Sequence, residues 1–256
     1  TVIAWLFPGQ GAQTVGMGED LFEGSAAARA VFERADAALG WSVSKLCFEG
    51  PPEALQLTAN TQPALVTVSM AALAALREAF PALAEPAFVA GHSLGEYSAL
   101  VAAEALTLED AVRLVHLRGR AMQEAVPAGV GTMAAVMADA DVVTEICTAA
   151  AQDEVLAPAN FNAPGQVVIA GHVAAVARAT ELAQNRKLKV MPLKVSAPFH
   201  SALMRPAAER MRAALAKVAL GRPRWPVVAN VTGEPESDPE RIRELLVRQV
   251  DGSVRW

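Results

Sequence analysis

The chain has 256 residues, of which 53% are apolar and 19% are charged, and its formal net charge is −5. This length and apolar content suffice for one large domain, or for a domain that carries a smaller inserted one. The acidic balance argues against a dedicated nucleic-acid binder, because such proteins carry a basic excess that neutralises phosphates.

The first elements are a predicted strand and a tight loop. Residues 2–7 form an apolar run ended by a Pro-Gly pair, which is typical of a buried strand. The loop GQGAQ follows it. This loop does not match a dinucleotide or phosphate loop, because Thr14 stands where the fingerprint needs its last Gly and no GK[ST] follows.

A buried helix and a βα unit come next. The apolar pattern of 63–80 predicts a helix with Asn60-Thr61 as caps and Pro63 in its first turn, where the missing N–H costs nothing. A strand at 87–90, the segment GHSLGE and an Ala-rich helix to residue 103 then indicate a parallel sheet. Thr107 and Asp110 form a capping-box-like start for a helix that runs to about residue 125.

Residues 129–195 change pattern. The predicted elements are a strand at 132–137, a helix at 139–151, strands at 155–161 and 166–170, a helix at 172–184 and a strand at 188–195. This βαββαβ order is that of a ferredoxin-like subdomain. We predict that it is inserted, with hinges at 127–129 and 196–198, into a larger α/β body formed by 1–128 and 196–256.

The C-terminal part predicts a helix at 206–220, a strand at 227–231, a turn-rich segment at 233–239 and a last helix capped by Asp238-Pro239. On that helix Gln249 lies one heptad after Ile242, on the apolar stripe.

Cysteine usage and hydropathy predict a cytoplasmic protein without a membrane partner. Cys47 and Cys147 are far apart and outside any CxxC motif, which favours free buried thiols in a reducing compartment. The longest apolar stretch, 64–76, is interrupted by Thr67 and Ser69 and is shorter than the roughly 18 residues that a membrane span needs. The N-terminal segment resembles a strand rather than a signal peptide.

Ser93 is the candidate nucleophile. Gly91-His92-Ser93-Leu94-Gly95 is a GxSxG segment between a predicted strand and a predicted helix, which is the context of a nucleophile elbow. The Leu94 N–H and the helix N-terminus would favour an oxyanion beside the exposed hydroxyl. The alternative is a Gly-rich turn whose serine only caps the helix.

A serine hydroxyl needs a base, and His suits that role near neutral pH. Of the four histidines, His116 lies mid-helix opposite the face that carries Arg118, as a surface residue would, and His172 opens a helix as a cap. His92 adjoins Ser93 but points away from it. His200, in SAPFHS at the second hinge, is therefore the predicted base.

Two polar residues stand on apolar helix faces. Arg118 is costly to bury unless it meets an anion, and a substrate carboxylate could accept two parallel hydrogen bonds from it. It could also reach solvent or pair with a structural acid. Gln249 could orient His200 in the place that an Asp usually takes, or serve as an interface amide.

Seven segments resemble the malonyl-CoA:acyl carrier protein transacylases over nearly the whole chain. They are FPGQGAQTVGMG from Phe7, QPAL from Gln62, GHSLGEYSAL from Gly91, RGRAMQ from Arg118, NFNAPGQVVIAG from Asn160, SAPFHSALM from Ser196 and LVRQ from Leu246. Members of this family usually continue for several dozen residues past the position of Trp256, with a Gly-Pro-Gly turn, a strand and a helix.

This resemblance implies an α/β-hydrolase-like large subdomain with an inserted ferredoxin-like one and the active site in the gap between them. Ser93 would be the nucleophile, His200 its base, and Gln249 would support His200 through its carbonyl. Gln10 and the Leu94 N–H would form the oxyanion hole, and Arg118 would bind the free carboxylate of malonate. The other residues that would line the site are Gln62, His92, Met122, Asn160, Asn162 and Phe199.

The implied reaction is a ping-pong transfer that needs no cofactor or metal. Ser93 takes the malonyl group from malonyl-CoA, and the phosphopantetheine thiol of an acyl carrier protein then accepts it, for fatty acid or polyketide synthesis. Two rivals stay open: an esterase or thioesterase, which Arg118 disfavours, and a carrier-docking module without turnover. Arg186, Lys187 and Lys189 could meet an acidic carrier or be solvated surface charges.

Overall fold

Two sheets organise the protein in a computed structural model that describes residues 2–195 and 197–256. One sheet has the strand order β1-β2-β7-β8 and the other the order β6-β3-β5-β4-β9. The protein therefore has a mixed α/β fold. Ser196, the first residue of the second predicted hinge, lies outside the described residues.

Each sheet belongs to one of two compact units. The first unit comprises the residues up to Arg120 together with Ala213–Ala229 and Glu234–Arg243. The second comprises Ala121–Arg212, Asn230–Gly233 and Glu244–Trp256. These units are defined by contacts, and the predicted subdomain boundaries at 128/129 and 195/196 stay a prediction.

The sheet of the first unit has a parallel core, as the βα pattern predicts. β1 (Ala4–Phe7), β2 (Phe88–Gly91) and β7 (Val227–Val228) run parallel, and β8 (Pro235–Glu236) is antiparallel to β7. Phe7 pairs with Gly91 at the ends of their strands. The loop that follows β1 and the turn that follows β2 therefore leave the sheet at the same edge.

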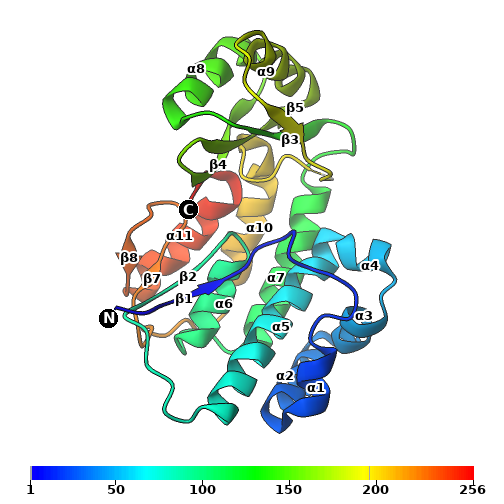
Figure 1. Ribbon diagram of the computed structural model, residues 1–256, viewed down its shortest axis with the longest axis vertical. Helices are drawn as coiled ribbons and strands as arrows, with labels where there is room; N and C mark the ends of the chain where they lie inside the picture. The colour runs from blue at the N-terminus through cyan, green and yellow to red at the C-terminus, as the bar shows by residue number, and fades with distance from the viewer. Residues whose placement is uncertain (1, 196) are drawn as a thin grey trace. The chain divides into compact units, whose positions relative to one another are not determined.

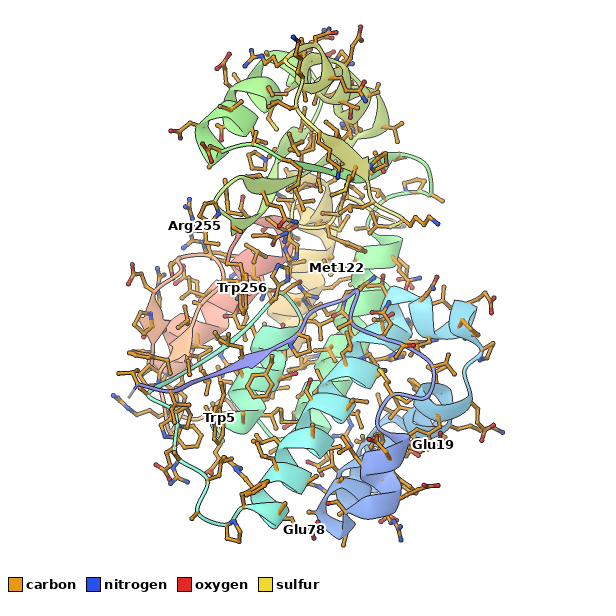
Figure 2. The ribbon with its side chains drawn as sticks, in the orientation of Figure 1. Trp5, Glu19, Glu78, Met122, Arg255 and Trp256 are labelled. Atoms are coloured by element: carbon orange, nitrogen blue, oxygen red, sulfur yellow. The ribbon has the colours of Figure 1, made fainter. Side chains whose placement is uncertain are left out.

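Helices pack against this sheet, but β1 is not the buried strand that the apolar run 2–7 predicts, because Val2 is 77% and Leu6 63% exposed. α6 (Gly95–Ala102) packs on β1 and β2, and α5 (Thr58–Ala79) packs against α6 and α2 (Ala26–Leu39), as Figure 1 shows. Four helices that we did not predict lie between residues 19 and 56: α1 (Glu19–Gly24), α2, α3 (Val43–Glu49) and α4 (Pro52–Gln56). α2 has an ordinary N-cap, since Ser25 Oγ accepts a hydrogen bond from the Ala28 N–H at 3.0 Å. Ser25 also donates to Glu78, labelled near the end of α5 in Figure 2.

α5 begins earlier than its sequence pattern indicates. The helix starts at Thr58, so Pro63 lies inside it rather than in its first turn, and Asn60-Thr61 are not its caps. Their side chains instead donate backwards to main-chain carbonyls, Asn60 Nδ2 to Ala54 at 2.9 Å and Thr61 Oγ1 to Leu55 at 2.5 Å. Within 2–195 and 197–256, α5 is the one helix long and apolar enough to cross a membrane, and 61% of that stretch is buried in the protein.

The second unit contains the predicted succession of two βαβ halves. Its elements are β3 (Gly131–Val136), α8 (Ala140–Ala151), β4 (Leu156–Ala163), β5 (Gln166–His172), α9 (Val173–Asn185) and β6 (Val190–Pro192). β3 lies between β5 and β6, and all these pairings are antiparallel. α8 and α9 pack together and against the sheet around Ile146, Ile169 and Val176 (Figure 1).

The remaining elements differ in part from the prediction. β9 (Val254–Arg255) adds a fifth strand parallel to β4, and β8 lies in the segment predicted as turns. Only Val227–Val228 of the predicted strand 227–231 is extended into the sheet. The helices are α7 (Leu108–Glu124), α10 (Arg205–Leu215) after a short 3-10 turn, and α11 (Pro239–Asp251). The Thr107 cap of α7 is confirmed, since its Oγ1 accepts from the Asp110 N–H at 3.1 Å.

Candidate active site

Ser93 lies on a strained turn between β2 and α6. Its φ is 53°, in the left-handed region that non-glycine residues rarely adopt. The turn is compact, because a Cβ at Gly91 would come within 1.8 Å of the Gly95 carbonyl oxygen, and one at Gly95 within 2.6 Å of the Phe7 carbonyl oxygen. Only glycine fits at both positions, as a nucleophile elbow requires.

Arg118 of α7 is buried beside this serine. Its Nη2 donates to Ser93 Oγ at 3.1 Å, and its Nη1 donates to Gln62 Oε1 on α5 at 2.8 Å. Arg118 and Gln62 are each only 1% exposed. The two hydrogen bonds thus fix the orientation of the guanidinium, with Nη2 directed at the candidate nucleophile.

Two further residues of the GHSLGEY segment act on Arg118, and the sequence reasoning missed both. Burial lowers the pKa of Arg118, while its electrostatic interactions with Tyr97 and Glu96 act in the opposite direction. Glu96 is 1% exposed, and the Arg118 Cζ lies 6.0 Å from the centroid of the Tyr97 ring. An arginine stays protonated even so, because its ordinary pKa is far above neutrality. The spacing Ser93, Glu96, Tyr97 on an elbow helix is the signal that could have found them.

The loop after β1 brings Gln10 to the same edge of the sheet. Gln10 Nε2 donates to Thr58 Oγ1, in the first turn of α5, at 3.2 Å. In the turn after Ser93, the N–H groups of Gly95, Glu96 and Tyr97 donate back to the carbonyls of His92, Ser93 and Leu94. The first unit therefore holds Gln10, Gln62, His92, Ser93, Leu94 and Arg118.

His200 lies in the second unit and is also strained, with a φ of 57°. Its Nδ1 lies 2.8 Å from the main-chain carbonyl oxygen of Gln249, in the last turn of α11. A carbonyl oxygen can only accept, so Nδ1 carries the proton and Nε2 keeps its lone pair. The partner is thus the backbone of Gln249, while its side-chain Nε2 donates to Asn230 Oδ1 at 3.4 Å.

The other predicted lining residues also belong to the second unit. Phe199 and Met122 are buried, Asn160 is buried on β4 next to a register shift, and Asn162 is half-buried on the same strand. Figure 2 labels Met122, near the C-terminal end of α7. Arg186 is engaged by Glu145 in an ion pair of 2.7 Å, as a surface charge would be.

Two histidines differ from their predicted environments. His116 is half-buried rather than a surface residue, and its Nδ1 lies 2.8 Å from the Ala59 carbonyl oxygen of α5. His172 occupies the N-cap position of α9 but makes no side-chain cap. Its Nδ1 instead accepts from the Val155 N–H at 2.9 Å, because that nitrogen faces the neighbouring strand.

Metal ligation has no candidate among residues 2–195 and 197–256, where no group of three His, Cys, Asp or Glu side chains could hold an ion. Cys47 and Cys147 are buried free thiols, one in each unit. Burial raises the pKa of both thiols to about 12, so neither is a reactive nucleophile near neutrality.

The known proteins that are similar to this chain include several malonyl transferases. The chain is 46% identical to the malonyl CoA-acyl carrier protein transacylase of Escherichia coli K12, covering 100% of this chain and 83% of the relative. The acyl-carrier-protein-S-malonyltransferase of Bartonella henselae superposes with a TM-score of 0.96 at 50% identity, covering 100% and 82% of the two chains.

A third similar protein was solved with a partner. It is a malonyl-transacylase in complex with its type II PKS acyl-carrier protein, with a TM-score of 0.96 at 43% identity, covering 100% of this chain and 83% of that one. The acyl transferase domain family matches residues 4–255. The chain therefore belongs to the acyl transferase domain family.

Proposed function

We propose that this protein transfers a malonyl group from malonyl-CoA to the phosphopantetheine thiol of an acyl carrier protein, and so supplies extender units for fatty acid or polyketide synthesis. The observation that carries the proposal is the buried Arg118 guanidinium 3.1 Å from Ser93 Oγ, held by Gln62. A malonyl thioester differs from a neutral acyl thioester by a free carboxylate, and a guanidinium fork binds that group with two parallel hydrogen bonds. The names of the relatives support the same substrate pair.

The first half-reaction is acylation of Ser93. His200 Nε2 takes the hydroxyl proton as Oγ attacks the thioester carbonyl, the C–O bond forms and the C–S bond breaks. The proton then passes from His200 to the departing CoA thiolate, which leaves as the thiol.

The second half-reaction reverses the roles with a new thiol. The phosphopantetheine thiol of the carrier loses its proton to His200, attacks the malonyl ester, and Ser93 leaves with that proton. Both tetrahedral intermediates carry an oxyanion, which we assign to the Leu94 N–H and to Gln10. Since the side-chain amide of Gln10 is engaged by Thr58, its main-chain N–H is the donor that we propose.

Further parts of the proposal follow from the fold. The first unit would correspond to an α/β-hydrolase-like subdomain, and the strand order β6-β3-β5-β4 supports a ferredoxin-like one. We propose that Asn160, Asn162, Met122, His92 and Phe199 line the acyl and pantetheine path. Because every atom in both half-reactions comes from the substrates, Ser93 and His200, the proposed chemistry uses no cofactor. The two free thiols support a cytoplasmic location.

Arg118 provides the test of substrate choice. We expect Arg118→Ala to lower kcat/KM for malonyl-CoA by an amount equivalent to about 2–5 kcal/mol, in line with truncating one partner of a buried charge pair. Acetyl-CoA, which has no free carboxylate, should not be affected in the same way. Arg118→Lys keeps the charge but loses the planar guanidinium, so its kcat/KM for malonyl-CoA should lie between those of the parent chain and of Arg118→Ala. An unchanged malonyl rate in Arg118→Ala would contradict the assigned role.

A further inference from the structure

The first five residues of α5, which span just over one turn, contact two residues of the proposed site, Gln10 and Arg118. Thr58 Oγ1 accepts a hydrogen bond from the side-chain amide of Gln10 at 3.2 Å, and Gln62 Oε1 accepts one from Arg118 Nη1 at 2.8 Å. Both Thr58 and Gln62 are almost completely buried. The position of this single turn therefore affects both the loop of Gln10 and the guanidinium next to Ser93.

The hydrogen bonding of this turn is unusual, because α5 contains Pro63. In a regular helix the N–H of residue 63 would donate to the carbonyl of Ala59, four residues earlier. Proline has no N–H, so this bond cannot form. The turn that carries Thr58 and Gln62 thus lacks one of the bonds that normally hold a helix together.

His116 of α7 supplies a donor at that position. Its Nδ1 lies 2.8 Å from the Ala59 carbonyl oxygen, and since a carbonyl only accepts, Nδ1–H is the donor. The His116 ring is supported by Trp41, with ring centroids 5.8 Å apart. Gly119, one turn further along α7, lies so close that a Cβ there would come within 2.5 Å of the Thr58 carbonyl oxygen.

We propose that His116 is a positioning residue for malonyl recognition: it replaces the helical hydrogen bond that Pro63 removes, and so fixes the turn from which Gln62 orients Arg118. This inference rests on the proposed function, because it assumes that Arg118 binds the malonyl carboxylate. A bidentate contact depends on the plane of the guanidinium, so a small displacement of Gln62 weakens malonyl binding more than acetyl binding.

The test compares substitutions that differ in where they place a donor. In Asn the Nδ2 donor is two bonds from Cβ, like His Nδ1, whereas in Gln the Nε2 donor is three bonds away, like His Nε2. We expect His116→Ala and His116→Gln to lower the malonyl-to-acetyl ratio of kcat/KM by about three- to tenfold, in line with the loss of one buried hydrogen bond. His116→Asn should restore the ratio to near that of the parent chain.

Two further variants keep the test independent of folding defects. Arg113→Ala removes another α7 side chain that donates to a main-chain carbonyl, that of Ala38 on α2 at 3.0 Å, and should leave the ratio unchanged. Pro63→Ala restores an N–H for Ala59, so His116→Ala should change the ratio less in that background than in the parent chain.

The outcomes are separable from those of the proposed function. If Arg118→Ala loses malonyl preference but His116→Ala does not, the positioning role is wrong and the proposed function stands. The positioning role would also be wrong if His116→Ala lowered the malonyl-to-acetyl ratio equally with and without Pro63→Ala, or if His116→Asn did not restore that ratio. If Arg118→Ala keeps its malonyl preference, the proposed function itself fails.

Discussion

Among single residues, His200, the proposed base, has an unusual partner. The last four carbonyls of a helix have no partner within the helix, and that of Gln249, in the last turn of α11, accepts His200 Nδ1–H at 2.8 Å. The negative end of the helix dipole would also stabilise the imidazolium that the proposed reaction forms. A helix end can thus do the work that an Asp carboxylate does in a triad.

This arrangement predicts different effects for the two residues of the pair. His200→Ala should lower kcat by about 10²- to 10⁴-fold, the usual value of a general base. Gln249→Ala keeps the main-chain carbonyl, so kcat should stay within about threefold of the parent, although losing the buried amide costs about 1–3 kcal/mol of stability. Steady-state kinetics and thermal unfolding of both variants check this. A kcat of Gln249→Ala as low as that of His200→Ala would contradict it.

The sequence predicted the candidate residues and the pairing of His200 with Gln249, but not the partners of Arg118 and Gln10. Ser93 could be predicted because its motif is local, and Arg118 because a charge on an apolar helix face is unusual. The contacts of Arg118 with Gln62 and of Gln10 with Thr58 join positions 56 and 48 residues apart, so no local pattern indicates them. The sequence predicts His116 on the surface because it lies opposite the helix face of Arg118, but its contacts with Ala59 and Trp41 leave it half-buried.

Among the elements, the elbow between β2 and α6 is the one with least room for change. Gly95→Ala would bring a Cβ within 2.6 Å of the Phe7 carbonyl oxygen and 2.7 Å of the Pro8 carbonyl oxygen. Both are backbone atoms, which cannot rotate away as a side chain would. We expect the free energy of unfolding to fall by several kcal/mol, comparable to the largest losses caused by overpacking a protein core.

Gly24→Ala is the matched control, since nothing lies within 4 Å of a Cβ at that position on α1. Thermal melts of the two variants should show a large drop in Tm for Gly95→Ala and almost none for Gly24→Ala. Similar melting temperatures would mean that the elbow is looser than described.

The predictability of the elements depended on their length and their contacts. The long helices α5 and α7 and the alternation of β3 to α9 were predicted because their hydrophobic period repeats several times. β7, β8 and β9 have two residues each, too few for any period, and are strands only because a neighbour pairs with them. The start of α5 differs from the prediction because Pro63, which usually occupies a first turn, lies inside this helix.

For the whole molecule, the two buried thiols predict a response to alkaline pH. Burial raises the pKa of Cys47 and of Cys147 from 9.0 to about 12 in the folded protein. Above about pH 9 the thiols ionise in the unfolded chain but not in the folded one. Their contribution to stability is therefore complete below pH 9 and is lost as the pH rises toward 12.

Thiol labelling measures the same property directly. Iodoacetamide at pH 8 should label neither cysteine in the native protein and both after denaturation, because the thiolate is the reacting form. A Cys47→Ser or Cys147→Ser variant assigns each signal. Rapid labelling of the native protein would contradict the burial of the thiols.

At the scale of the whole molecule, the residues assigned to the proposed chemistry come from both units. Ser93, Gln62 and Arg118 belong to the first, whereas His200 and Gln249 belong to the second. The resemblance of seven separate segments predicted the family from the sequence, and the family match over residues 4–255 together with the 46% identity to a malonyl CoA-acyl carrier protein transacylase confirms it. Whether these residues transfer a malonyl group is tested by the reaction itself.

The most direct test is intact-protein mass spectrometry of the chain mixed with malonyl-CoA, followed by addition of a phosphopantetheinylated acyl carrier protein. We predict a malonyl adduct that maps to Ser93, is absent in Ser93→Ala, and moves to the carrier when the carrier is added. An adduct that never forms, that maps elsewhere, or that is released only as free malonate would contradict the proposed transfer.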